Sequence, residues 1–329
     1  MGFPINSVAI LGAGALGSLY GAWMARAGLD VTLVAREAHV KAIQDNGLQV
    51  FSAGASQMSV PIRAVSDPGL VGDVDLLVLA SKSFDTHELL DNWPGHPAFA
   101  FSLQNGVGQA AELAKRYGGS AVGAASMVGA TMSNPGEIWH TFGGATYLGD
   151  LPASNESSAE KIGETLSTGL EVVVASDIRS VQWSKAVLAV AAMGVVGLTR
   201  QDYHRVFLQP DSRAVFLELV REAASVAVVD GAELVDLPGP LGVASLLSLS
   251  DDEAMRRLEG IGKEMAESGA TNVRVSILQA IDRQRPLEVD AVFADVVSRA
   301  HEHGIDVPLV ENVTRLLAAV DATIRGDAL

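Results

Sequence analysis

The chain has 329 residues, of which 48% are apolar and 19% charged, a composition typical of a globular protein with room for two domains. Its formal net charge of −16 argues against a surface that binds nucleic acid or anionic membranes, because such binding needs clustered Lys and Arg. Cysteine is absent, which excludes disulfides, thiolate metal sites and a cysteine nucleophile, and fits a cytoplasmic protein.

Two further features argue against secretion and membrane insertion. The segment from Met1 to Val8 has no basic region leading into an apolar segment, so no secretory signal is expected. The longest apolar run, Ala186–Leu198, is shorter than the roughly 20 residues needed to span a bilayer. We interpret this run as a buried helix of a soluble protein.

Short apolar runs alternate with helical stretches in the first half of the chain, a pattern typical of βαβ units and a parallel sheet. Strands are expected at Ser7–Leu11, Val31–Ala35, Leu76–Ala80, Phe99–Leu103, Ala121–Ser126, Thr146–Gly149 and Glu171–Ala175. A helix around Ala159–Ser167 is expected before the last of these strands. The sheet should end near Ser176, which predicts a first domain over residues 1–176.

A glycine-rich loop directly follows the first expected strand and opens a helix that runs to about Ala27. The loop reads Gly12-Ala13-Gly14-Ala15-Leu16-Gly17. In this strand–loop–helix context the spacing predicts a Rossmann domain that binds a nicotinamide dinucleotide. Gly12 permits the tight turn, Gly14 lets the backbone approach the pyrophosphate, and Gly17 allows close packing of helix on strand. The N–H groups of the helix amino terminus would hold the phosphates.

The end of the second strand discriminates between the two nicotinamide cofactors, because the residue there meets the adenosine ribose. The chain has Arg36 at this place, and an Arg suits the 2′-phosphate of NADP(H). Glu37 follows at once and could face the other way. A surface Arg after a strand is also common, but NADP(H) is the expected cofactor.

The second half of the chain has a helical pattern, with an expected cap at Ser176 or Asp177. Pro286 is well placed to open a helix that ends near Gly304, and Pro308 to open a final helix. Other long helices are expected over Arg213–Val229 and Asp251–Glu267. Residues 177–329 are therefore predicted to form an all-α domain.

Lys82 and Asn105 each follow an expected strand, which places both at the ligand edge of a parallel sheet. Together with other segments they resemble, in order and spacing and nearly from end to end, the ketopantoate reductase (2-dehydropantoate 2-reductase) family. The segments are the glycine loop, Arg36, Ser81-Lys82, Leu103-Gln104-Asn105-Gly106, Trp183-Ser184-Lys185, Ser276 and Glu288-Val289-Asp290.

The resemblance implies NADPH-dependent reduction of a 2-oxo acid in a cleft between a Rossmann domain and an all-α domain like the carboxyl-terminal domain of 6-phosphogluconate dehydrogenase. It implies that Lys82 and Asn105 contact the cofactor and help form the cleft, where Asn105 also meets the substrate. It further implies that Lys185 is the general acid, that Ser276 lies near the substrate carboxylate, and that Glu288 is a substrate-binding and catalytic acid.

Two of these residues also have chemical arguments. Hydride delivery to a carbonyl leaves negative charge on oxygen, so an ammonium such as that of Lys185 can stabilise the charge and supply the proton. A Lys at the mouth of a buried helix can also simply extend to water. Glu288, in the first turn after Pro286, would be favoured there by the helix dipole alone.

The sequence departs from the family where asparagines usually follow the catalytic lysine at one and two turns. Ala189 and Met193 occupy these positions, and both should line the substrate wall beside Lys185 because residues four apart share a helix face. An asparagine expected three residues before Ser276 is replaced by Val273, with Asn272 one residue away. The reaction type survives these changes, whereas the substrate does not follow from the resemblance.

Two other functions stay open. One is a dehydrogenase that oxidises a less polar, non-pantoate alcohol or 2-hydroxy acid, and the other is an NADP-binding regulatory protein without catalysis.

The pair His301 and His303 lacks the spacing of a helical metal site, and neither metal nor covalent catalysis is expected. The expected partner is a small carbonyl or alcohol substrate, with a homodimer plausible because the second domain is apolar.

Overall fold

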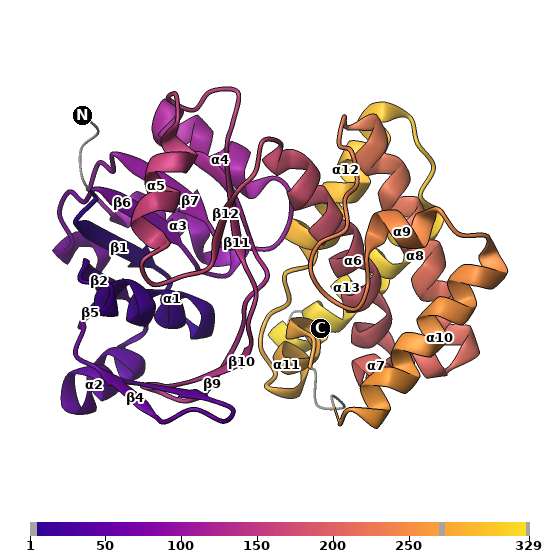
Figure 1. Ribbon diagram of the computed structural model, residues 1–329, viewed down its shortest axis with the longest axis horizontal. Helices are drawn as coiled ribbons and strands as arrows, with labels where there is room; N and C mark the ends of the chain where they lie inside the picture. The colour runs from indigo at the N-terminus through magenta and orange to yellow at the C-terminus, as the bar shows by residue number, and fades with distance from the viewer. Residues whose placement is uncertain (1–4, 270–273, 327–329) are drawn as a thin grey trace. The chain divides into compact units, whose positions relative to one another are not determined.

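The computed structural model describes residues 5–269 and 274–326. Its contacts divide the chain into two compact units, Met1–Ile178 and Arg179–Leu329, called unit 1 and unit 2 below (Figure 1). Unit 1 contains all the strands found in the described residues and several helices, whereas unit 2 is built of helices. The expected order of an α/β domain followed by an all-α domain is therefore confirmed.

The centre of unit 1 is a five-stranded parallel sheet. Across the sheet the strands are β5 (Arg63–Val65), β2 (Asp30–Val34), β1 (Ser7–Leu11), β6 (Leu76–Leu79) and β7 (Phe99–Ser102). All neighbours pair in parallel, with Leu11 opposite Val34 on one side and Leu79 on the other. The carboxyl ends of β2, β1 and β6 therefore meet at one edge.

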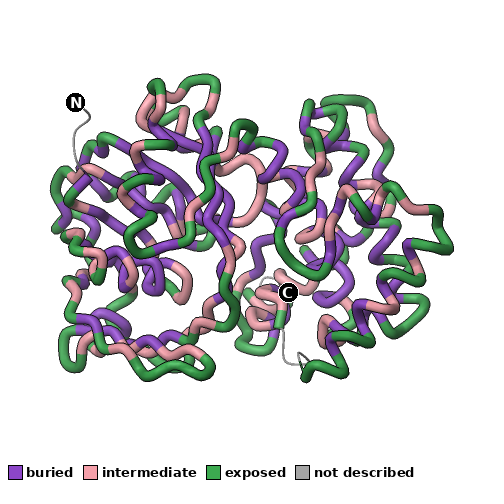
Figure 2. Tube along the Cα trace, viewed as in Figure 1, coloured by how far each residue is buried: buried purple, intermediate pink, exposed green. Residues whose placement is uncertain are grey.

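Both faces of this sheet are buried, which explains why its strands read as continuous apolar runs rather than alternating patterns. Ile10 packs in one hydrophobic core with Leu19 of the helix α1 (Ala15–Arg26), while the next residue, Leu11, packs in a separate core with Leu113 of α4 (Gln109–Tyr117). Successive side chains point to opposite faces, so each strand serves two cores. The strands β1, β6 and β7 are buried over almost their whole length (Figure 2). The helices of unit 1 are α1 (Ala15–Arg26), α2 (Glu37–Asn46), α3 (Thr86–Asn92), α4 (Gln109–Tyr117), α5 (Ser158–Leu166) and the 3₁₀ turns η1 (Pro68–Leu70), η2 (Ser83–Asp85) and η3 (Gly118–Ser120).

A second group of strands extends this sheet through a single bridge between Ala100 and Ala121. Its strands, in order, are β12 (Val172–Val174), β11 (Thr146–Asp150) and β8 (Val122–Ser126), with β11 antiparallel to β8. All seven strands expected from the sequence are thus present, with ends that differ by one residue at most.

A four-stranded mixed sheet in unit 1 was not expected from the sequence. It consists of β4 (Met58–Val60), β3 (Leu48–Ser52), β10 (Glu137–Phe142) and β9 (Gly129–Asn134). In β10, Ile138 is fully buried while Trp139 is 43% exposed, so only one face of the strand packs against the core. Such strands give no continuous apolar run in the sequence, and they are easily read as loops.

Unit 2 consists of helices around the long α6. In chain order they are α6 (Ile178–Thr199), α7 (Tyr203–Leu208), α8 (Pro210–Val229), α9 (Val243–Leu247), α10 (Asp251–Glu267), α11 (Ser276–Asp282), the π-helix η5 (Asp290–Ala294), α12 (Asp295–His303) and α13 (Pro308–Arg325). A Cβ on Gly194 of α6 would lie 3.1 Å from Val313 of α13 and 3.2 Å from Leu219 of α8, so small residues let these helices approach closely.

Helix α6 is longer than the apolar run in the sequence, because its first turns contain polar residues before Ala186. Among the described residues it is the one helix long and apolar enough to cross a membrane, but 72% of its most apolar window is buried inside the protein. Both Val187 and Val196 are completely buried. Helix α6 is therefore a buried core helix of unit 2.

The prediction that Pro286 opens a helix is wrong. The segment from Arg285 to Glu288 is not helical, and the helix starts only after Glu288 with the π-turn η5. The backbone N–H of Leu287 donates instead to the Oδ1 atom of Asp321 on α13, at 2.7 Å. A contact 34 residues away in the sequence therefore holds this amide and delays the helix start, which no local pattern reveals. The helix does end at Gly304, as expected.

Candidate active site

The glycine loop lies at the carboxyl edge of the parallel sheet, between β1 and α1. Gly12 has a φ of +81°, and a Cβ on it would lie only 2.3 Å from the Cα of Ser81, so both its conformation and its contact require glycine. The N–H groups of Gly12 and Ala13 donate to the carbonyl of Val34, which fixes the loop against β2. A Cβ on Gly17 would lie 2.9 Å from that of Ala80, so the absence of a side chain lets α1 pack closely on the sheet.

Gly14 is a glycine that the protein's own packing does not require. A Cβ built on it would meet open space, with the nearest atom 4.0 Å away. It is also the N-cap of α1, so no side chain caps the amides of Ala15, Leu16 and Gly17 in the first turn. The loop therefore combines uncovered helix-terminal donors with room for a ligand, which fits a pyrophosphate.

A buried histidine, His39, is connected to the glycine loop through hydrogen bonds. The Nδ1 atom of His39 on α2 accepts the N–H of Gly136 at 2.8 Å, so its Nε2 carries the proton and donates to the Oγ of Ser18 at 2.9 Å. Ser18 in turn donates to the carbonyl of Ala13 in the loop. The turn between β9 and β10 is thereby connected to the cofactor loop.

Arg36 is the N-cap of α2 and follows β2, beside the glycine loop. Its side chain is 78% exposed, and its Nη2 atom lies 3.6 Å from the Oδ2 of Asp85 at the end of η2. Asp85 follows β6, which lies on the other side of β1 from β2. This acidic neighbour cannot be found from a local sequence pattern, because the contact joins residues 49 positions apart.

Lys82 and Asn105 lie just beyond β6 and β7, at the same edge of the sheet. Between them, the buried side chain of Gln104 connects the two loops. Its amide nitrogen donates to the carbonyl and Oγ of Ser81 and to the Oγ1 of Thr86, at 2.7–3.1 Å, and its Oε1 accepts from Ser102. The resemblance to the family implies no role for Gln104. The structure assigns it the positioning of Lys82 and Asn105.

In unit 2, the charges of Lys185 and Glu288 interact. Burial of the Lys185 ammonium lowers its pKa from its ordinary value of 10.5 to about 8, and the negative charge of Glu288 opposes that change. Glu288 is itself 94% buried, since only 6% of its surface is exposed. A lysine with this pKa exchanges its proton readily near neutral pH, as a general acid must.

Three further expected substrate residues lie in unit 2. Ala189 and Met193 follow Lys185 along one stripe of α6, since residues four apart share a helix face. The Oγ of Ser276, at the first turn of α11, lies 4.0 Å from the sulfur of Met193. The structure therefore brings Ser276 to the stripe of α6 that carries Lys185. Asn272 and Val273 lie outside the described residues.

The start of α6 is fixed by Asp230, a buried carboxylate that the sequence did not single out. It accepts from the indole N–H of Trp183 at 2.8 Å and pairs with Arg179 at 2.6 Å, both on α6, and with Arg299 of α12 at 3.3 Å. These partners hold the pKa of Asp230 below its usual value, against the effect of burial. The carboxylate thus joins α6, which carries Lys185, to α12, which follows Glu288 in the chain.

The two histidines near the end of α12 each lie beside a carboxylate. His301 lies 2.7 Å from Glu311 of α13, and His303 lies 3.4 Å from Asp230. Both therefore connect α12 to neighbouring helices.

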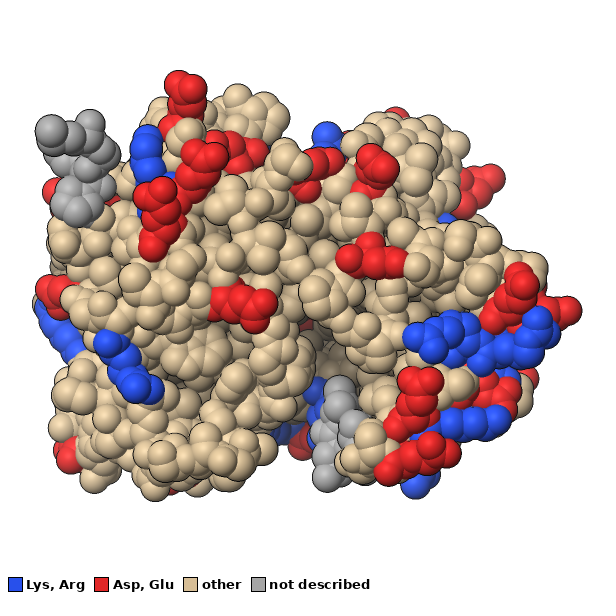
Figure 3. Space-filling view, in the orientation of Figure 1, with Lys and Arg blue, Asp and Glu red and all other residues tan. Residues whose placement is uncertain are grey.

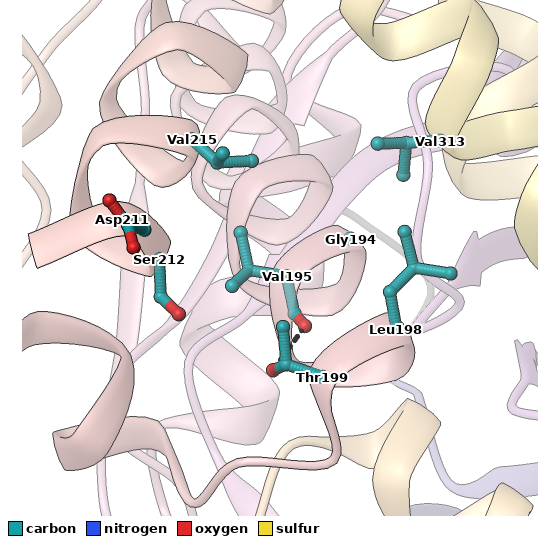
Figure 4. Close-up of a pocket in the computed structure, with 8 residues that line it drawn as sticks. All are labelled: Gly194, Val195, Leu198, Thr199, Asp211, Ser212, Val215 and Val313. Atoms are coloured by element: carbon teal, nitrogen blue, oxygen red, sulfur yellow. Dashed lines mark hydrogen bonds between the residues drawn. The ribbon is translucent and has the colours of Figure 1, made fainter. Parts of the chain in front are cut away.

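An apolar pocket of about 200 Å³ lies on another side of α6. In Figure 4, Val195 and Leu198 point into the space between Val215 of α8 and Val313 of α13. Gly194 and Leu198 lie roughly opposite the stripe of Lys185, Ala189 and Met193 on the helix. The pocket presents no basic side chain to an anionic substrate, so it is separate from the candidate active site.

Comparisons with known proteins agree with this geometry. The family description "Ketopantoate reductase PanE/ApbA" matches residues 8–153, and "Ketopantoate reductase PanE/ApbA C terminal" matches residues 177–321. The chain belongs to the ketopantoate reductase family. It is therefore a nicotinamide-dependent oxidoreductase that acts on small molecules.

Individual relatives extend over nearly the whole chain. A 2-dehydropantoate 2-reductase of Pyrococcus abyssi is 31% identical over 91% of this chain and 93% of its own. The crystal structure of a PanE/ApbA family ketopantoate reductase from Ralstonia eutropha JMP134 is 28% identical, with a TM-score of 0.80 over 97% of this chain and 99% of that one. A ternary structure of D-mandelate dehydrogenase with NADH and anilino(oxo)acetate has a TM-score of 0.81 over 97% of this chain and 99% of that one, but at 21% identity it shows the fold alone.

Proposed function

We propose that this protein reduces the carbonyl group of a 2-oxo acid, with NADPH as the hydride donor and Lys185 as the proton donor. The observation that carries the proposal is Lys185 itself, a partly buried lysine whose desolvated ammonium has a pKa of about 8 and interacts with the negative charge of Glu288. A structural lysine at a helix surface has no need of either feature.

The cofactor half of the proposal rests on unit 1. The room at Gly14 and the first-turn amides of α1 suit a pyrophosphate, and Arg36 suits a 2′-phosphate through charge-assisted hydrogen bonds. When bound, NADPH supplies the hydride. Lys82 and Asn105, positioned by Gln104, would hold the cofactor at the carboxyl edge of the sheet.

The chain's own residues then handle the proton and the substrate. The ammonium of Lys185 stabilises negative charge on the substrate oxygen and donates its proton to that oxygen. Glu288 favours the protonated form of Lys185 and would accept a hydrogen bond from the substrate. The hydroxyl of Ser276 would donate to the substrate carboxylate.

The side chains beside Lys185 bear on the substrate class. The Pyrococcus relative is named for ketopantoate, a 2-oxo acid with a hydroxyl group, whereas Ala189 and Met193 offer an apolar stripe beside Lys185. This stripe favours a second candidate, a dehydrogenase for a less polar 2-hydroxy acid or alcohol. The D-mandelate dehydrogenase of the same fold acts on such a compound.

A reductase screen tests the proposal. Purified protein with NADPH is offered a series of 2-oxo acids, and cofactor oxidation is followed. Lys185→Ala should lower turnover about 10²–10⁴-fold while the dissociation constant of NADPH stays nearly unchanged. Lys263→Ala, which removes an exposed lysine of the same unit, is the matched control and should retain full activity. Near-normal turnover in a folded Lys185→Ala variant would contradict the role of Lys185, and binding of NADPH without turnover of any substrate would favour a regulatory protein.

The cytoplasmic location and the homodimer remain predictions. Sedimentation of the purified protein tests the second.

A further inference from the structure

The cofactor edge of unit 1 contains an acidic side chain that the proposed function does not use. Asp85 ends η2, after β6, and its Oδ2 atom lies 3.6 Å from the guanidinium of Arg36, after β2. In the sheet, β1 lies between β2 and β6. The ion pair therefore joins the two segments that flank the strand leading into the glycine loop.

Both members of this pair are accessible to a ligand. The side chain of Arg36 is 78% exposed and that of Asp85 is 38% exposed. An exposed ion pair contributes little to stability, so the fold does not depend on it. An acid at this place is instead unfavourable for a phosphate, because the carboxylate of Asp85 already pairs with the guanidinium that a 2′-phosphate would need.

We propose that Asp85 is a specificity-determining residue, which competes with the 2′-phosphate of NADP(H) for Arg36 and so narrows the preference for NADP(H) over NAD(H). The inference rests on the proposed role of Arg36 in cofactor binding. NAD(H) has a 2′-hydroxyl in place of the phosphate, so its binding leaves Arg36 with Asp85 and carries no penalty from the carboxylate. The chain thus has a basic residue that favours NADP(H) and an acidic residue that weakens its effect.

The test measures dissociation constants of both cofactors, without any turnover. Asp85→Asn keeps the size of the side chain and removes its charge. We expect this variant to bind NADPH roughly threefold to tenfold more tightly and NADH about as well as the wild type. The gain should shrink at high salt, because the charges are exposed and the Debye length falls below about 10 Å above 0.1 M. Asp45→Asn is the matched control, because Asp45 is also an exposed acid paired with a cation, Lys41, on α2.

A double-mutant cycle with Arg36→Ala separates this inference from the proposed function. In the Arg36→Ala background, Asp85→Asn should no longer change the ratio of the two dissociation constants appreciably. An unchanged ratio in Asp85→Asn alone, or an equal gain with and without Arg36, would overturn the competition. Failure of the proposed cofactor preference has a different signature, since Arg36→Ala would then weaken both cofactors equally.

Discussion

The charge of Lys185 depends on two opposing influences, burial and the carboxylate of Glu288. Reduction needs the ammonium form, which supplies the proton, so the fraction of competent enzyme falls as pH rises through the pKa of about 8. We expect kcat/KM for reduction to be level at neutral pH and to decline above about pH 8, while the reverse oxidation, which needs the neutral amine, increases. Rates measured in both directions across the alkaline range check this.

The Glu288→Gln variant sharpens that measurement. Loss of the negative charge removes the influence that raises the pKa of Lys185, so the alkaline decline should begin at lower pH. Glu267→Gln, at the exposed end of α10, leaves Lys185 untouched and should keep the wild-type profile. A wild-type rate that stays level far above pH 8 would mean that another group donates the proton.

Ala189 and Met193 should determine which 2-oxo acids the protein prefers as substrates. A site that hydrogen-bonds a substrate hydroxyl rejects analogues without it, whereas an apolar wall discriminates only weakly by size. The hydroxyl of ketopantoate, buried against these two side chains, would lose water without gaining a partner, at about 1–3 kcal/mol. We therefore expect kcat/KM for an apolar 2-oxo acid of similar size to exceed that for ketopantoate roughly tenfold to a hundredfold.

The double substitution Ala189→Asn with Met193→Asn should shift this preference back toward ketopantoate. Efficient turnover of ketopantoate by the wild type would show that other groups, such as Glu288, already satisfy the hydroxyl.

At the scale of elements, the sequence predicted the parts of the fold whose signals are local. The parallel strands were found because burial on both faces makes them continuous apolar runs, and the glycine loop because its spacing directly follows one of them. The mixed sheet was missed because β10 buries Ile138 but exposes Trp139. The start of η5 was misplaced because Asp321, far along the chain, binds the amide of Leu287.

The same distinction applies to the candidate site. Gly12, Arg36 and Lys185 could be named from sequence because each lies in a recognisable local segment. Gln104, Asp230 and Asp85 act through contacts between distant segments, with Trp183 and Asp230 separated by 47 positions. A single sequence contains no record of such pairings, so the residues that position the site came from the structure.

The contact between Asp321 and Leu287 makes α13 a support for the segment that carries Glu288. Asp321→Ala leaves the N–H of Leu287 without its acceptor, and we expect a loss of about 1–3 kcal/mol in the free energy of unfolding. Because Glu288 follows Leu287 directly, the alkaline decline in activity should also shift to lower pH, as in Glu288→Gln. Asp321→Asn retains an acceptor oxygen and should restore both properties. An unshifted profile in Asp321→Ala would limit this residue to a structural role.

At the scale of the whole molecule, the formal net charge is −16, and on the face shown in Figure 3 the acidic side chains lie in several places rather than in one patch. On the face shown in Figure 3, basic side chains over α10 are intermixed with acidic ones, in agreement with the pairs of Lys263 with Glu259 and Arg257 with Glu264. A net charge of −16 disfavours the compact state through self-repulsion, and this repulsion weakens as acid neutralises carboxylates. Mild acid should therefore stabilise the protein unless a specific group acts in the other direction.

His39 is such a group. Burial lowers its pKa below the ordinary value of 6.5, and its neutral ring must accept the N–H of Gly136, which a protonated ring cannot do. Near and below pH 6.5 the unfolded chain therefore binds more protons than the folded chain. The free energy of unfolding that the neutral ring contributes is fully present above pH 6.5 and is lost as the pH falls through the lower pKa of the folded protein. His39→Gln provides an acceptor for Gly136 and a donor for Ser18 without titrating. We expect urea denaturation of the wild type to show a larger loss of stability between neutral and mildly acidic pH than denaturation of this variant, since both share the same relief of self-repulsion. Equal losses in the two proteins would mean that protonation of His39 is tolerated in the folded state.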